Sequence, residues 1–172
     1  ILPLGPTGYG DSLYQSVSTF AGNPYFIDLE TLIDKKLRTK EECESCDWGG
    51  SESYVDYEKM YLSRFKLLRK AYERANLKND PDYVAFLKQE EDWLLDYCLF
   101  MAIKNAQNGK CWIDWPEELK DRHSKAVKEA EKELAEEVEF YSFQQYCFTT
   151  QWSKLKKYAN QKGILIIGDV PI

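Results

Sequence analysis

The sequence is poor in histidine and in net positive charge. It has one histidine, and its formal net charge is −6 over 172 residues. That histidine, His123, lies in the charged segment KDRHSK and is expected at the surface, which argues against a Ser-His-Asp triad. Nucleic-acid surfaces need clustered Lys and Arg to neutralise phosphates, so the acidic balance disfavours a nucleic-acid partner.

Long apolar runs and a second C-x-x-C motif are also missing. No run approaches the roughly 18 residues that a membrane span needs, and no charged-apolar-small leader is seen. The five cysteines are odd in number and mostly far apart. This usage favours a reduced, cytoplasmic protein. The lone C-x-x-C at Cys43 and Cys46 lacks the second ligand pair of a zinc site and the βαβ context of a redox site, so we expect a polar loop and no metal.

A Gly- and Pro-rich stretch, residues 1–28, stands out in what remains. From Gly5 to Ser12 it reads GPTGYGDS, one residue away from the phosphate-binding pattern G-x-x-x-x-G-K-[ST]. Asp11 stands where that pattern needs Lys, and the following LYQSVSTFAGNPY does not resemble the start of a helix. A carboxylate at the centre of an anion site is electrostatically unfavourable, so nucleotide binding is disfavoured.

The same loop has the residue types that bind neutral sugars. Sugars are held by aromatic faces and by side chains that donate and accept hydrogen bonds in a concave site. The loop contains Tyr9, Asp11, Ser12, Tyr14 and Gln15. The residues alone leave open a second interpretation, in which the tyrosines cap the edge of a core.

Apolar periodicity and capping residues predict a largely helical chain. A short helix is expected over 28–37, with Asp28 as its N-cap. Longer helices are expected from Asp56, from Asp80-Pro81 to about Gly109, after Pro116, and from about 138 to 162 with a stop at Gly163. The last two could be one bent helix.

The end of the sequence predicts a buried strand. Residues 164–167 read ILII, and Asp169 follows. A continuous apolar strand after a helix is typical of a parallel sheet, in which ligands bind at the carboxyl ends of strands. Both ends of the sequence, ILPL and GILIIGDVPI, are apolar, whereas domain termini are usually polar and exposed. We therefore expect a chain cut from within a larger domain.

Five blocks together resemble one known family. They read LPLGPTGYGDSLYQS, FAGNPYFIDLE, WLLDYCLFMAIK, FQQYCFTTQWSKLKKYAN and GILIIGDVPI. In order and spacing they are similar to the amylomaltase or disproportionating-enzyme family, the 4-alpha-glucanotransferases of glycoside hydrolase family 77. Leu13 departs from the pattern, because the family usually has Pro there.

The resemblance implies an α/β fold, in which this chain is a fragment of a (β/α)₈ TIM barrel and is predominantly α by residue count. Residues 1–37 would hold the end of strand 2 and the glucan-binding loop. Residues 38–137 would form a helical insertion, and residues 138–172 a barrel helix and strand 3.

The resemblance also implies the transfer of α-1,4-glucan segments with retention, without an organic cofactor. The family's catalytic carboxylates would lie beyond Ile172, so none is expected in this chain. The substrate-binding residues would be Tyr9, Asp11, Ser12, Tyr14 and Asp169, with malto-oligosaccharide as the partner. The competing hypothesis is a non-catalytic helical module that binds carbohydrate or another protein. Preferred glucan length and oligomeric state are left open.

Overall fold

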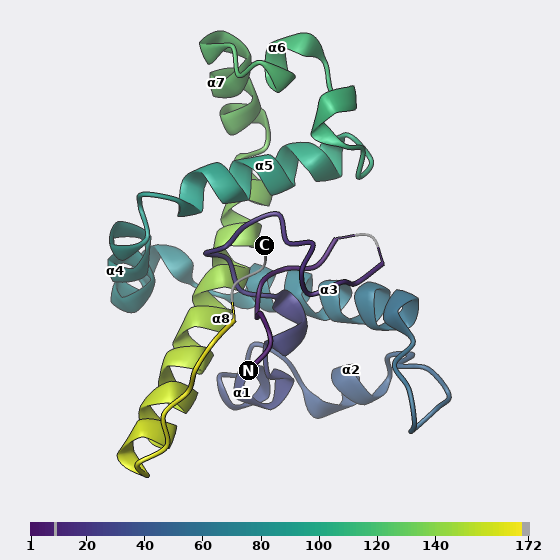
Figure 1. Ribbon diagram of the computed structural model, residues 1–172, viewed down its shortest axis with the longest axis vertical. Helices are drawn as coiled ribbons and strands as arrows, with labels where there is room; N and C mark the ends of the chain where they lie inside the picture. The colour runs from purple at the N-terminus through teal and green to yellow at the C-terminus, as the bar shows by residue number, and fades with distance from the viewer. Residues whose placement is uncertain (9, 170–172) are drawn as a thin grey trace. The chain divides into compact units, whose positions relative to one another are not determined.

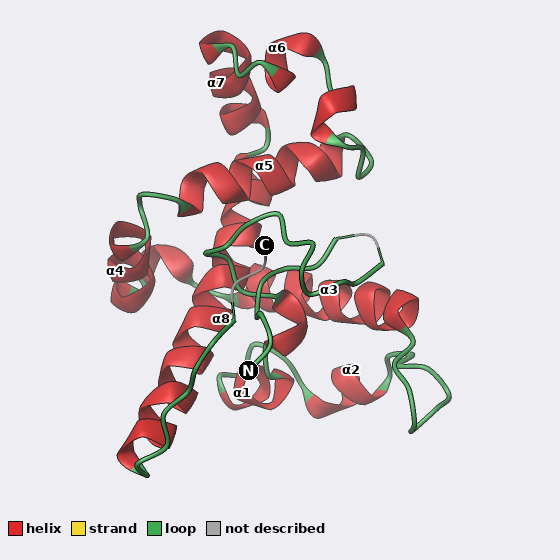
Figure 2. Cartoon of the chain, in the orientation of Figure 1, coloured by secondary structure: helices red, strands yellow, loops and turns green. Residues whose placement is uncertain are grey.

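The computed structural model describes residues 1–8 and 10–169, and these form helices joined by loops (Figures 1 and 2). The α-helices are α1 (Leu29–Asp34), α2 (Lys40–Glu44), α3 (Tyr57–Arg74), α4 (Pro81–Gln89), α5 (Leu94–Ala106), α6 (Glu117–Lys120), α7 (Ser124–Glu133) and α8 (Ala135–Gln161). Short 3₁₀ helices lie at Pro24–Phe26, Leu77–Asn79 and Trp112–Asp114. The predicted predominance of helix is confirmed.

Local side-chain chemistry explains where several helices begin and end. Asp28 accepts hydrogen bonds from the backbone N–H groups of Glu30 and Thr31, and Asp56 caps α3 through the N–H of Lys59. Such caps satisfy N–H groups that have no partner inside the helix. α8 ends at Gln161, and Gly163 follows two residues later with a φ of +76°, which glycine adopts without steric cost.

The expected helix from Asp80 to Gly109 is interrupted, which corrects that prediction. α4 ends at Gln89 and α5 begins at Leu94. Between them, the Trp93 indole N–H donates to a Glu90 carboxylate oxygen at 2.7 Å. The run QEEDW has no Gly or Pro, so the sequence gives no backbone signal for the break.

The chain divides into two compact units. The first comprises residues 1–81 and 144–172, and the second residues 82–143. In the first unit α3 supplies Leu67, Leu68 and Ala71 to the core. In the second, a cluster forms around Leu99 and Trp115, with Ile103 and Ala130 beside them. The three-part division at residues 37 and 137 describes barrel topology and stays a prediction.

The expected buried strand at residues 164–167 is not formed, which corrects a second prediction. Leu165 is 85% exposed and Ile167 81% exposed. Among the described residues, the β-pairing is an isolated bridge between Thr7 and Ser16. Ile167 accepts one hydrogen bond from the amino group of Ile1, at 2.6 Å. A strand requires neighbouring strands to pair with its backbone, and this segment has none among the described residues.

A charge cluster joins α2 to the preceding turn and to α3. Glu42 completes a capping box with Thr39 and accepts two hydrogen bonds from Arg74, at 2.7 and 2.8 Å. Arg38 approaches the same carboxylate at 3.0 Å. Hydrogen bonding by Arg74 is the main reason why the pKa of Glu42 is lowered to about 2.

This cluster gives a pH-dependent stability. Because the folded pKa of Glu42 lies below the ordinary value of about 4.3, its contribution is present above that value and is lost as the pH falls toward 2. We expect Glu42→Gln to lower the melting temperature at pH 6 and to have little effect near pH 2. Glu44→Gln is the control, because the pair of Glu44 with Lys40, at 3.6 Å, is exposed to solvent. An identical loss for Glu42→Gln at both pH values would contradict this assignment.

No helix within residues 1–8 and 10–169 combines the length and the apolar character needed to cross a bilayer.

Candidate functional site

A tight turn positions Asp11 at the tip of the Gly-rich loop. Gly10 and Asp11 both have left-handed backbones, with φ of +86° and +51°, and the Asp11 N–H donates to the Gly8 carbonyl at 3.2 Å. The Thr7 hydroxyl donates to the Asp11 carboxylate at 2.9 Å. The carboxylate is therefore held inside the loop by a local hydrogen bond, an arrangement unlike the extended Lys of a phosphate-binding loop.

A second turn brings the chain back and presents Tyr14. The Gln15 N–H donates to the Ser12 carbonyl at 3.2 Å, and Ser16 pairs with Thr7 across the loop. Gly5 packs closely here, because a Cβ at that position would lie 2.6 Å from the Ser16 hydroxyl oxygen. The loop is thus closed on itself, with Ser12 half-buried and Tyr14 47% exposed.

The Tyr14 hydroxyl donates to the Asp169 carboxylate at 2.8 Å, across 155 positions of sequence. The hydrogen bond to Asp169 raises the pKa of the Tyr14 hydroxyl. The tyrosine therefore stays neutral as a donor and acceptor beside a carboxylate acceptor. Both side chains are exposed. A paired hydroxyl and carboxylate at an accessible position are groups with which a polyol hydroxyl forms hydrogen bonds.

The five predicted site residues are distributed unevenly. Tyr14 and Asp169 are in direct contact, while Asp11 is bonded to Thr7 in a separate pair. Ser12 lies between Asp11 and Tyr14 in the sequence of the loop. Tyr9 lies outside the described residues.

Tyr25 is a neighbour of the loop that the sequence interpretation missed. Burial, and then the negative charge of Asp11, raise the pKa of Tyr25 to about 12. Its ring meets Phe65 edge-on, with 6.4 Å between centroids, and its N–H is capped by Asn23 at 2.9 Å. The sequence feature that could have identified Tyr25 is Asn-Pro-Tyr. In such a sequence the Asn side chain accepts from the backbone N–H two residues on, which fixes the direction of the Tyr side chain.

Two glutamines of α8 hold the chain that follows the loop. Gln145 accepts from the Gly22 N–H at 2.8 Å and donates to the Gly22 carbonyl at 3.0 Å. Gln151 makes the same pair of bonds with the backbone of Asp28, at 2.7 and 3.1 Å. Gly22 also lies against Phe148, since a Cβ at Gly22 would be 2.0 Å from that ring. The loop is therefore fixed to α8 at two places.

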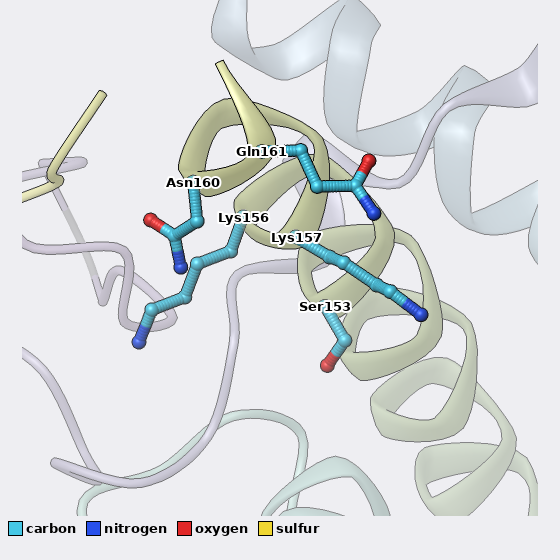
Figure 3. Close-up of a pocket in the computed structure, with 5 residues that line it drawn as sticks. All are labelled: Ser153, Lys156, Lys157, Asn160 and Gln161. Carbon is cyan, nitrogen blue, oxygen red and sulfur yellow. The ribbon is translucent and has the colours of Figure 1, made fainter. Parts of the chain in front are cut away.

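The hollows of the first unit do not include Tyr14 or Asp169 in their linings. One, of about 660 Å³, is lined by Leu4 and Asp28 of the Gly- and Pro-rich stretch and by residues of α1 and α8, among them Trp152 and Tyr158. Another, of about 520 Å³, is lined only by residues of α8: Ser153, Lys156, Lys157, Asn160 and Gln161 (Figure 3). In that view, Lys156 and Asn160 extend from one side of the helix, and Lys157 and Gln161 from the other. A surface formed by a single helix does not enclose a ligand, so this hollow is not a candidate site.

Comparison with known proteins places this geometry in a family. The family model described as 4-alpha-glucanotransferase, glycoside hydrolase family 77, matches residues 1–172. The chain belongs to this family, and the resemblance found in the sequence is confirmed.

Individual relatives are similar in sequence to this chain over its whole length. The chain is 46% identical to the 4-alpha-glucanotransferase of Clostridium butyricum over 172 residues, which is 100% of this chain and 35% of the relative. It is also 46% identical to that of Thermus thermophilus over 176 residues, which is 34% of the relative. A solved structure, the amylomaltase of Streptococcus agalactiae in complex with acarbose, superposes with a TM-score of 0.91 at 36% identity. The superposition covers 99% of this chain and 35% of that one. The chain thus spans about one third of the length of these relatives.

Proposed function

We propose that this chain is the glucan-binding part of a 4-alpha-glucanotransferase, which transfers α-1,4-glucan segments between oligosaccharides by a retaining double displacement. Two findings support the proposal. The chain belongs to that family over all 172 residues, and it superposes on an amylomaltase solved with acarbose. The free cysteines of the described residues are compatible with a reducing compartment, and we place the protein in the cytoplasm.

One observation carries the assignment of the site. The Tyr14 hydroxyl and the Asp169 carboxylate come from distant parts of the sequence and form an accessible pair at 2.8 Å. In such a pair the carboxylate accepts hydrogen bonds from sugar hydroxyls, and the tyrosine hydroxyl accepts from or donates to an adjacent hydroxyl of the same ring. Asp11 and Ser12 would line the same loop, and Tyr9 would offer an aromatic face.

The proposed role of these residues is to position the glucan. Fixed hydrogen bonds near the reacting bond reduce the entropy cost of reaching the transition state. The retaining mechanism itself needs a nucleophile and an acid/base carboxyl group about 5 Å apart. We assign both to the part of the relatives that this chain does not span.

We further propose that residues 164–169 become the third strand of a (β/α)₈ barrel, preceded by α8. The exposed side chains of Leu165 and Ile167 support this, because a barrel strand buries such residues between its neighbours. Asp169 would then stand at the carboxyl end of the strand, where barrel enzymes bind substrates.

Removing the Tyr14 hydroxyl tests the site. We expect Tyr14→Phe to weaken acarbose binding by about 5- to 10-fold, since a net hydrogen bond contributes about 1 kcal/mol. Isothermal titration calorimetry of the chain with acarbose measures the effect. Tyr54→Phe is the matched control, because Tyr54 is 75% exposed in a different loop.

Asp169→Asn extends the same test, since it alters the acceptor of the Tyr14 hydrogen bond. Unchanged affinity in both site variants would exclude this pair from the glucan site. Failure of the unaltered chain to bind acarbose at millimolar concentration would remove the substrate-binding role assigned to it.

A further inference from the structure

The C-x-x-C motif lies in a hydrogen-bonded turn at the end of α2. The Cys46 N–H donates to the Cys43 carbonyl at 3.4 Å, which closes an i to i+3 turn. The end of this turn is fixed to α3, because the Ser63 hydroxyl donates to the Asp47 carbonyl at 2.6 Å and Lys59 pairs with the Asp47 carboxylate at 2.9 Å. The two cysteines are therefore held in a fixed local geometry.

That geometry suits a disulfide. A turn of this kind brings its first and fourth Cα atoms within about 7 Å, and disulfides join Cα atoms about 4.4–6.8 Å apart. In an i to i+3 turn the two side chains also project on the same side. Cys43 and Cys46 are both free thiols and are both partly exposed, so a small reagent has access to them.

The surroundings of Cys43 contain buried positive charge. Arg38 is 2% exposed, and within residues 1–8 and 10–169 its Nε and Nη1 atoms have no hydrogen-bond partner. The Nε atom of Arg64 is likewise buried and has no hydrogen-bond partner among the described residues. Buried N–H groups without acceptors are rare and costly, and a nearby anion would satisfy them.

The charged groups near the Cys43 thiol act in opposite directions. Burial raises its pKa, and Cys46 and Glu42 act in the same sense, whereas the guanidinium of Arg38 lowers it. The net effect is a raised pKa, and Arg38 offsets part of the cost of forming a thiolate in this partly buried position.

We propose that Cys43 and Cys46 are an oxidisable dithiol, which closes to an intramolecular disulfide on reaction with a low-molecular-weight disulfide. One cysteine loses its proton to solvent and attacks a sulfur of the reagent, which forms a mixed disulfide and expels one thiolate. The second cysteine loses its proton and attacks the mixed disulfide at the protein sulfur. A second reagent thiolate leaves, so the protein loses two electrons and two protons, and the reagent disulfide is reduced to two thiols.

Glutathione disulfide is the probe that tests this proposal. The reduced chain is incubated with it, the remaining thiols are blocked with N-ethylmaleimide in urea, and the product is analysed by intact mass and peptide mapping. We expect a product with an internal Cys43–Cys46 bond, while Cys98 and Cys147, which are buried in the folded chain, carry the blocking group. Cys46→Ser should instead stop at a glutathione adduct on Cys43. Cys111→Ser, which removes an exposed thiol, should leave the internal bond unchanged.

The fold makes a separate contribution that a flexible C-x-x-C would lack. In glutathione redox buffers, we expect the native pair to be half-oxidised under conditions about tenfold more reducing than the same pair in urea, because the turn is already formed. Modification of Cys111 alone, without a Cys43–Cys46 bond, would overturn the proposal. Equal or easier oxidation in urea would also overturn it, since the folded turn would then contribute nothing.

Discussion

Replacing Gln145 with leucine is expected to lower the free energy of unfolding by roughly 2–6 kcal/mol. Gln145 is 1% exposed and pairs with both the N–H and the carbonyl of Gly22. Leucine fills a similar volume but offers neither donor nor acceptor. Two buried backbone groups would then lose their partners, at about 1–3 kcal/mol each. Urea denaturation followed by circular dichroism measures the change.

Gln151→Leu is the matched control for this prediction. Gln151 lies on the same helix and makes the same two bonds, but to the solvent-exposed backbone of Asp28. Water replaces lost partners at an exposed site, so we expect a cost below about 1 kcal/mol. Similar losses for the two variants would mean that burial at Gly22 does not determine the energetics of the contact.

Local features of this fold were predictable from sequence because local chemistry determines them. The carboxylates of Asp28 and Asp56 cap helices at the expected positions. The helices α5 and α8 end close to Gly109 and Gly163 as expected, and both glycines have a positive φ. Each involves a few neighbouring residues, so no tertiary information is needed. The exposed position of His123 followed in the same way from its charged neighbours.

Features that depend on distant partners were not predictable in this way. The apolar run at residues 164–167 predicted a strand, but a strand forms only with a pairing partner. Gln145 looks like an ordinary polar residue of a helix, and its role emerges only when Gly22 is placed beside it.

For the candidate site as well, the sequence indicated residue types but not the long-range contact between them. The loop composition indicated a sugar ligand only as one of two interpretations, and the family resemblance added Asp169. Neither argument gave the contact between Tyr14 and Asp169, which spans 155 positions. The pairing of Asp11 with Thr7 is local, within four residues, yet it depends on the left-handed turn at Gly10. Sequence thus indicated the chemistry, while the structure supplied the pairing.

The chain by itself is expected to leave maltotriose unchanged, because the proposed division of roles leaves it without the catalytic carboxylates. Retaining transfer needs two carboxyl groups flanking one glycosidic bond, about 5 Å apart. Here Asp11 is bonded to Thr7, and Asp169 accepts from Tyr14, in two separate pairs. Each has a binding role in the proposal, and neither pair supplies a nucleophile together with an acid.

Chromatography of the products after incubation with maltotriose measures this result. The Thermus thermophilus 4-alpha-glucanotransferase serves as the positive control, because it shares 46% identity with the chain over 176 residues. Enzymes accelerate their reactions by at least about 10⁶-fold, so even a small share of the parent's activity would be visible above a buffer blank. Glucose and longer maltodextrins that disappear with Asp11→Asn or Asp169→Asn would place catalysis within these residues. That result would contradict the assignment of this chain to substrate binding alone.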